Sequence, residues 1–210
     1  MVQETLGVGF ILPAAQCDLA LTTTEKGYLS GVTFLGMVVS AHAWGFCADT
    51  FGRKKVLVTS VFGAWAFSFA SSLIPTAALF IGFRFLTGLF LCGTTSTVYA
   101  YLSEFLPSAN RSKIMTWTCG FIAGAYLLIP GIAWLLLPVK INWNLGFVVF
   151  TSWRLYIVIM GILSFVEFVV FLYFPESPKF LMSVGKKQEA LQVLRYVYAL
   201  NSGNSGDDYP

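Results

Sequence analysis

The segment GFCADTFGRKKV (Gly45–Val56) separates two long apolar runs with four charged residues and two glycines. The runs on either side, 27–48 and 56–74, each have about the 20 apolar residues that a helix needs to cross the hydrocarbon core of a bilayer. Glycine permits a tight turn, and consecutive cations are unfavourable inside lipid. The segment therefore predicts a short, charged turn between two membrane-spanning helices.

The whole chain has the composition of a membrane protein. Of its 210 residues, 57% are hydrophobic and 11% are charged, whereas a soluble domain carries about 25% charged residues. One globule of this size cannot bury so much apolar surface, so we expect much of it to face lipid.

Several other functional classes are not supported by the sequence. The net charge of +3 is small and the basic residues form no single patch, so no nucleic-acid partner is expected. The four cysteines have neither disulfide nor metal-ligand spacing, and no cofactor is expected. The sequence contains no nucleophile–base set and no phosphate-binding loop, so we do not expect an enzyme.

Apolar runs divide the chain into spans. Five are long enough to cross a bilayer: 27–48, 56–74, 77–102, 114–138 and 155–174. A sixth run, 4–14, is about half as long as a span, so we expect a truncated first helix and a chain that is a fragment. Residues 1–174 therefore predict an all-α polytopic bundle, and the spacing of Gly120 and Gly124 favours close helix packing there.

The remaining carboxyl-terminal residues are more polar. Residues 175–200 are expected to form a cytoplasmic loop that contains a short amphipathic helix, because apolar residues recur at helical spacing after Lys187. Residues 201–210 are polar and glycine-rich and are expected to be disordered. The segment 140–153 is too short to cross and is expected to pack over the mouth of the bundle.

Basic residues are divided unevenly between the two sides of the predicted bundle. One side carries nine of them: Arg53, Lys54, Lys55, Arg111, Lys113, Lys179, Lys186, Lys187 and Arg195. The other side carries Lys26, Lys140 and Arg154, and Arg84 lies within a span. Cations near the ends of spans favour the cytoplasm, so the side with Arg53 is expected to be cytoplasmic. The expected location is the plasma membrane or an intracellular vesicle membrane, with the lipid bilayer as a partner.

Four motifs resemble those of the major facilitator superfamily. GFCADTFGRKK resembles the signature Gly-x-x-x-Asp-x-x-Gly-Arg-[Lys/Arg], which this family carries between its second and third helices. RFLTG (84–88), YLSEFLPSANR (101–111) and PESPKFL (175–181) follow in the family's order, the last as in sugar-porter-like members. One motif alone is weak evidence, but four in order, each in its expected place, are a specific signal.

The branch of the family can be narrowed further. LPAAQCDLALT (12–22) and EKGYLSGVTFLGMVVSAHAWG (25–45) resemble synaptic vesicle glycoprotein 2-type proteins, whereas organic-cation and sugar transporters are more distant. The resemblance covers residues 4 to about 200, which correspond to the amino-terminal six-helix half of a protein of two halves. It implies a missing carboxyl-terminal half as a partner of this chain.

The resemblance also implies roles for charges on the cytoplasmic side. In this family the charged turn contacts the other half in one conformation, which implies that role for Gly45, Asp49, Gly52 and Arg53. In sugar-porter-like relatives, charges across the helix ends pair when the inner gate is closed, and the matching residues are Glu104, Arg111 and Glu176. The alternative is that Arg53, Lys54 and Lys55 serve only as topology anchors.

Three ionisable residues fall within the predicted spans, where each costs about 2.5–3.5 kcal/mol at the bilayer centre. Glu4 is a candidate to meet a cationic substrate or carry a proton. Arg84 belongs to RFLTG, and the resemblance to antiporters implies that it faces the central pathway. Buried structural pairing is the alternative for both, and for Glu167, which the family pattern does not explain, a structural role is equally open.

Together these patterns predict a secondary active transporter that moves a small organic ion or polar metabolite by alternating access. The alternative is a non-transporting membrane receptor or trafficking protein of the synaptic-vesicle type that retains the fold. That alternative predicts large luminal loops, which this chain does not contain.

Overall fold

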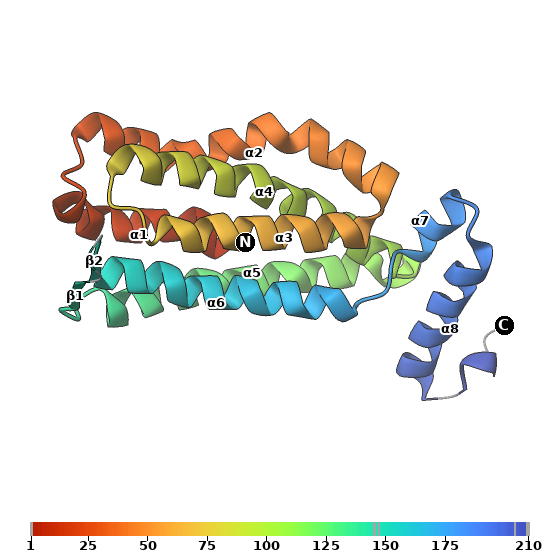
Figure 1. Ribbon diagram of the computed structural model, residues 1–210. Helices are drawn as coiled ribbons and strands as arrows, with labels where there is room; N and C mark the ends of the chain where they lie inside the picture. Colours follow the sequence, from red (N-terminus) through yellow and green to blue (C-terminus); the bar gives the residue numbers. More distant parts are fainter. Residues whose placement is uncertain (1, 145, 147, 204, 209–210) are drawn as a thin grey trace.

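The computed structural model describes residues 2–144, 146, 148–203 and 205–208. Its long helices are α1 (Val2–Asp18), α2 (Thr23–Phe51), α3 (Arg53–Ser71), α4 (Ala77–Glu104), α5 (Ser108–Leu136) and α6 (Ser152–Tyr173). Consecutive helices run in opposite directions along one bundle (Figure 1). Residues 204, 209 and 210 of the expected disordered tail lie outside the described residues.

Short elements mark the two ends of the bundle (Figure 1). A hairpin of β1 (Asn142–Asn144) and β2 (Val149–Thr151) lies beside the α1–α2 and α3–α4 connections, and we call this the hairpin end. The opposite end holds α7 (Pro178–Ser183), α8 (Lys187–Ser202) and the 3₁₀ turn η1 (Gly206–Asp208), and we call it the α8 end. The hairpin lies in the segment 140–153, which is expected to pack over the mouth of the bundle. Between its two strands, the Asn144 side chain accepts a hydrogen bond from Gly146 N–H at 2.9 Å.

Four of the described helices, α2, α4, α5 and α6, are long and apolar enough to cross a membrane by length and composition. Helix α1 has 17 residues, and α3 begins with three cations, which lower its hydropathy. Large apolar side chains also lie on the outside of the bundle, for example Phe121 on α5, which is 79% exposed. Such a surface suits lipid, and the chain is an integral, multi-pass membrane protein.

The helices begin at polar residues that the apolar pattern does not include. Helix α2 begins at Thr23, four residues before the predicted span, because Thr22 and Glu25 form a capping box. Glu25 N–H donates to the Thr22 hydroxyl at 3.2 Å, and Thr22 N–H donates to the Glu25 carboxylate at 2.9 Å. Helix α5 likewise begins at Ser108, six residues before the predicted span.

Glycines set the crossing of α2 and α4. A Cβ atom at Gly36 would lie 2.4 Å from the Phe85 carbonyl oxygen, and one at Gly88 would lie 2.1 Å from the Thr33 carbonyl oxygen. The two backbones therefore touch, as small residues allow in membranes. The prediction of close packing at Gly120 and Gly124 is wrong within the described structure, because a Cβ atom at either position would meet no atom within 4 Å.

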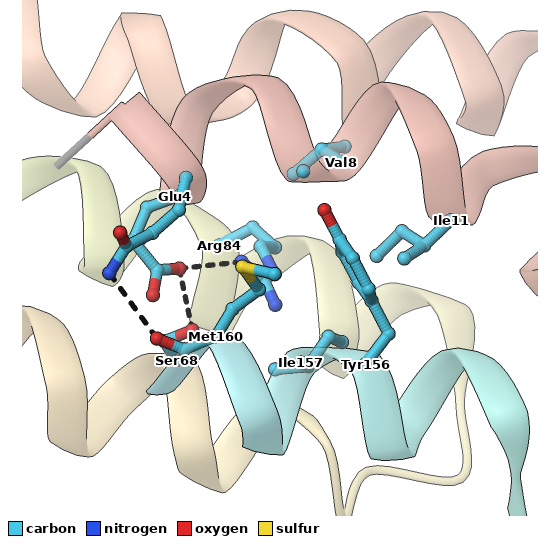
Figure 2. Close-up of a pocket in the computed structure, with 10 residues that line it drawn as sticks. Glu4, Val8, Ile11, Ser68, Arg84, Tyr156, Ile157 and Met160 are labelled. Atoms are coloured by element: carbon cyan, nitrogen blue, oxygen red, sulfur yellow. Dashed lines mark hydrogen bonds and ion pairs between the residues drawn. The ribbon is translucent and has the colours of Figure 1, made fainter. Parts of the chain in front are cut away.

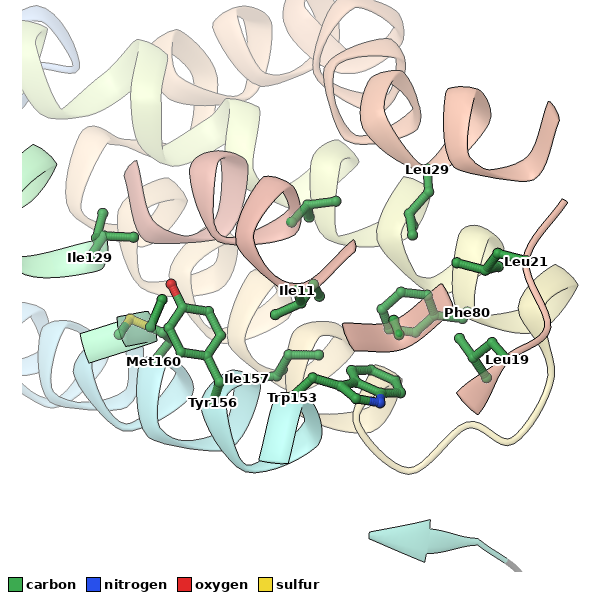
Figure 3. Packing of buried hydrophobic residues seen from close by; sticks show 13 residues of the cluster. Ile11, Leu19, Leu21, Leu29, Phe80, Ile129, Trp153, Tyr156, Ile157 and Met160 are labelled. Carbon is green, nitrogen blue, oxygen red and sulfur yellow. The ribbon is translucent and has the colours of Figure 1, made fainter. Parts of the chain in front are cut away.

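The main apolar core lies around α1, near the hairpin end (Figure 3). Ile11 on α1 is buried among side chains from α2, α4 and α6, including Leu29, Phe80 and Trp153. The rings of Phe80 and Trp153 pack edge to face, with centroids 5.4 Å apart. Helix α1 is therefore held on several sides, and its polar residues are positioned by a packed interior.

Candidate functional site

The centre of the site is an ion pair between α1 and α4. Arg84 Nη1 lies 3.2 Å from Glu4 Oε2, and Figure 2 shows the two side chains meeting inside the bundle. Arg84 is 2% exposed and Glu4 is 4% exposed, so the pair has almost no contact with solvent. Removing two charges from water costs several kcal/mol per ion, about what their mutual attraction returns, and hydrogen bonds from neighbours must supply the rest.

Helix α3 supplies those hydrogen bonds. The Ser68 hydroxyl donates to Glu4 Oε2 at 2.6 Å, and Arg84 Nη2 donates to the Ser71 hydroxyl at 3.0 Å. The two serines are three residues apart, so they lie on one face of α3 and reach both members of the pair. The site therefore draws on α1, α3 and α4.

Some polar atoms of the site have no hydrogen-bond partner among the described residues. They are Glu4 Oε1, Arg84 Nε and the hydroxyl of Tyr156, which reaches in from α6. The residues around them enclose a cavity of about 10 Å³ (Figure 2), about the space that one water molecule needs. Unpartnered buried polar atoms are costly, and these three lie around one cavity.

Glu167 on α6 lies on a second small cavity, also of about 10 Å³. Glu4 lines both cavities, and Thr94 and Ser164 complete the polar part of the second one. The three ionisable residues predicted within the spans are thus gathered: Glu4 pairs with Arg84, and Glu167 shares a cavity with Glu4.

A second charged cluster lies at the α8 end, around Arg53. Arg53 Nη2 lies 3.0 Å from Asp49 Oδ1, and Arg53 Nε lies 3.3 Å from Glu104 Oε1. Its guanidinium also lies 5.4 Å from the centroid of the Phe180 ring. Arg53 therefore connects the ends of α2 and α4 to α7.

Glu176 fixes the start of α3. Its Oε1 atom accepts hydrogen bonds from Lys54 N–H at 2.9 Å and from Ser177 N–H at 3.0 Å, where the positive end of the α3 dipole favours a carboxylate. Ser177 in turn donates its hydroxyl proton to Glu104. Gly52 lies beside this carboxylate with φ of +106°, and a Cβ atom there would come within 2.5 Å of Glu176 Oε2.

Of the seven residues predicted to act on the cytoplasmic side, two lie outside the cluster around Arg53. Gly45 is exposed on α2, and a Cβ atom there would meet nothing within 4 Å. Arg111 is exposed and donates to the Leu106 carbonyl at 3.5 Å, and the described residues give it no ion-pair partner. The other five, Asp49, Gly52, Arg53, Glu104 and Glu176, come together at the α8 end.

An ion pair at the hairpin end, between a buried arginine and an aspartate at the surface, is not among the residues predicted from the sequence. Arg154 is 1% exposed, and its Nη2 atom lies 3.2 Å from Asp18 Oδ2 at the end of α1. Arg154 Nη1 donates to the carbonyl oxygens of Ser72 and Ile74 at 2.8 and 2.6 Å. Arg154 directly precedes the predicted span 155–174, a position where a basic residue is ordinary, so the sequence carries no signal for this pair.

A polytopic bundle of apolar helices that encloses ion pairs between its members is the architecture of a membrane protein with an internal polar site. The model of the sugar (and other) transporter family matches residues 8–206. The chain belongs to this family.

Curated relatives agree with this assignment. The chain is 33% identical to human synaptic vesicle glycoprotein 2C over 203 residues, which cover 94% of this chain and 28% of the relative. It is 34% identical to rat synaptic vesicle glycoprotein 2A over 208 residues, which cover 97% of this chain and 28% of the relative. The chain thus spans less than a third of the length of these relatives.

Solved structures show the same fold. A structure of the major facilitator superfamily proton:xylose symporter XylE bound to 6-bromo-6-deoxy-D-glucose gives a TM-score of 0.80 at 18% identity, covering 92% of this chain and 46% of that one. The partially occluded inward-open xylose transporter XylE from E. coli gives 0.81 at 17% identity, covering 97% and 56%. The predicted all-α fold, the amino-terminal half of a major facilitator bundle, is confirmed.

Proposed function

We propose that this chain is the amino-terminal half of a secondary active transporter that moves a small organic ion or polar metabolite by alternating access. The observation that carries the proposal is the buried Glu4–Arg84 pair with unpartnered polar atoms beside it. Ionisable residues inside a membrane are expensive, and such residues mark substrate or ion pathways. A bundle that only anchored the protein in the membrane would have no use for buried ionisable residues.

In the proposed mechanism a polar group of the substrate binds Glu4 or Arg84 and so competes with the ion pair between them. Glu4 Oε1, Arg84 Nε and the Tyr156 hydroxyl offer an acceptor, a donor and a group that can do either. A cation or proton that binds Glu4 weakens its attraction for Arg84, and an anionic group competes for Arg84. Coupling of transport to a proton or ion therefore runs through these two residues, with Glu167 near enough to Glu4 to take part.

The charged cluster at the α8 end is proposed to control closure on the cytoplasmic side. The Arg53–Asp49 pair is exposed on its Asp49 side, and exposed pairs contribute only about 0–1 kcal/mol, so this pair biases two conformations without fixing one. Asp49 has a 76% exposed side chain and Gly45 has open space around it. Both are therefore free to contact a second six-helix half when the two halves close.

The test is counterflow of labelled solutes by the full-length protein in liposomes, with a panel of organic cations, organic anions and monosaccharides. Wild type should accumulate one class. Asp49→Ala should slow that transport several-fold without loss of folded protein, because the side chain is exposed. Lys55→Ala, which removes an exposed charge from the same turn, is the matched control and should transport normally.

A second variant tests the buried pair directly. Arg84→Met should abolish accumulation, and Ser68→Ala, which removes only one hydrogen bond to Glu4, should reduce it. Equal transport by Asp49→Ala and wild type would remove the charged turn from the mechanism. If wild type moves none of the panel while it remains folded, the receptor or trafficking function retained on this fold is favoured instead.

A further inference from the structure

An apolar groove of about 410 Å³ lies between α8 and the ends of α4 and α6, a volume within the usual range of about 300–1,000 Å³ for ligand pockets. Its walls include Leu102 from α4 and Phe105 directly after it, Phe174 after α6, and Val197 and Leu200 from α8. The Tyr101 hydroxyl on one wall already donates to the Pro175 carbonyl. The interior therefore offers apolar contact, and its occupant must present hydrocarbon.

Several residues that line the groove are strongly exposed. Its rim includes Tyr173, which is 84% exposed in the last turn of α6, and Leu200, which is 68% exposed on α8. Helix α8 runs across the direction of the bundle helices, as an interfacial helix does (Figure 1). Tyrosines at the ends of spans lie at the level of the lipid headgroups. The opening thus lies where an acyl chain joins its headgroup.

The α8 end carries unpaired positive charge. Ion pairs occupy three of its nine basic residues, namely Arg53, Lys186 and Arg195. Within the described part of the chain, no ion pair is formed by the other six: Lys54, Lys55, Arg111, Lys113, Lys179 and Lys187. Arg111 donates to the Leu106 carbonyl, one residue beyond Phe105 of the groove. A cluster of cations beside a bilayer attracts anionic headgroups.

We propose that the groove binds one acyl chain of an anionic phospholipid from the surrounding leaflet. The unpaired cations of the α8 end attract the headgroup, and the hydrocarbon lies between α8 and the end of α6. The bound lipid would contact both α8 and the bundle and so hold the helix in place. This site is separate from the Glu4–Arg84 pair, so it does not depend on a transport activity.

The experiment places p-benzoylphenylalanine at Leu200 in the full-length protein, reconstituted in liposomes of a zwitterionic lipid with one-fifth anionic lipid. After illumination, mass spectrometry identifies what is attached. Leu200 should yield lipid adducts whose anionic fraction exceeds that of the bulk lipid several-fold, and ~1 M salt should bring the ratio toward bulk, because salt screens the cations. The same label at Gln188, exposed on α8 outside the groove, should yield no such enrichment.

A second variant tests the groove itself. Val197→Asp places a carboxylate inside it and should reduce the adducts at Leu200 strongly, whereas Gln188→Glu should leave them unchanged. Attachment of Leu200 to another segment of the same protein would show that protein covers the groove and would overturn the proposal. Lipid adducts at the bulk ratio, or none from a folded protein, would overturn it as well.

Discussion

At the scale of single residues, three arginines form ion pairs that connect the long helices. Arg84 and Arg154 are buried and each pairs with a carboxylate on α1, near its two ends. Arg53 is more exposed and connects α2, α4 and α7. The positions of these pairs predict different roles. The Arg84 and Arg154 pairs determine where α1 lies, whereas Arg53 pairs at the end of the bundle with Asp49, whose side chain is 76% exposed and free to exchange partners.

The glycines of the chain also differ in how much their replacement by alanine should destabilise the protein. Gly52→Ala should destabilise the protein by about 1–3 kcal/mol, because φ of +106° with extended ψ is a region that only glycine adopts without strain. The new Cβ atom would also clash with Glu176. Thermal unfolding in detergent measures the loss.

Gly45→Ala is the matched control for that substitution. It places the same methyl group in open space within a helix, so the midpoint of thermal unfolding should stay the same or rise slightly. Equal losses for both variants would show that the backbone at Gly52 does not adopt this conformation.

At the scale of the elements, α1 is the helix whose position depends most on charge. Its end at Asp18 is joined to α6 by Arg154 and by Trp153, whose indole N–H donates to Asp18 at 3.0 Å. Arg154 also reaches the α3–α4 connection through two carbonyl oxygens. This junction makes the hairpin end of the bundle one unit.

Asp18→Ala should therefore loosen that unit. Arg154 would remain buried without its carboxylate, at a cost of about 1–3 kcal/mol. Hydrogen exchange should accelerate in the last turn of α1 more than in the centre of α4. Lys140→Ala, which alters an exposed charge at the same end, should leave exchange unchanged. Uniformly faster exchange along all helices would contradict a local role for Asp18.

Much of this organisation was predictable from the sequence, for physical reasons. Glu4 and Arg84 were identifiable because charges are rare within apolar runs. Asp18 and Arg154 lie at the ends of spans, where charges are ordinary, and their pairing across 136 positions has no local signal. Gly36 and Gly120 look alike in sequence, and only the packing of whole helices decides which one touches a neighbour.

At the scale of the whole molecule, the chain has two ends of different character. The α8 end carries the charged turn, the cluster around Arg53 and nine basic residues, whereas the hairpin end carries three. Closure on the cytoplasmic side and binding of an anionic lipid both require that the α8 end faces the cytoplasm. That orientation is a prediction from the distribution of cations.

Cysteine accessibility in intact cells tests this central claim most directly. In a full-length protein without its native cysteines, Thr50→Cys and Asn110→Cys mark the two turns of the α8 end, and Asn142→Cys marks the hairpin. A maleimide that cannot cross membranes should react with Asn142→Cys only when it is added on the non-cytoplasmic side. It should react with Thr50→Cys and Asn110→Cys only when it is added on the cytoplasmic side. Labelling of Thr50→Cys and Asn110→Cys from opposite sides would contradict the bundle itself.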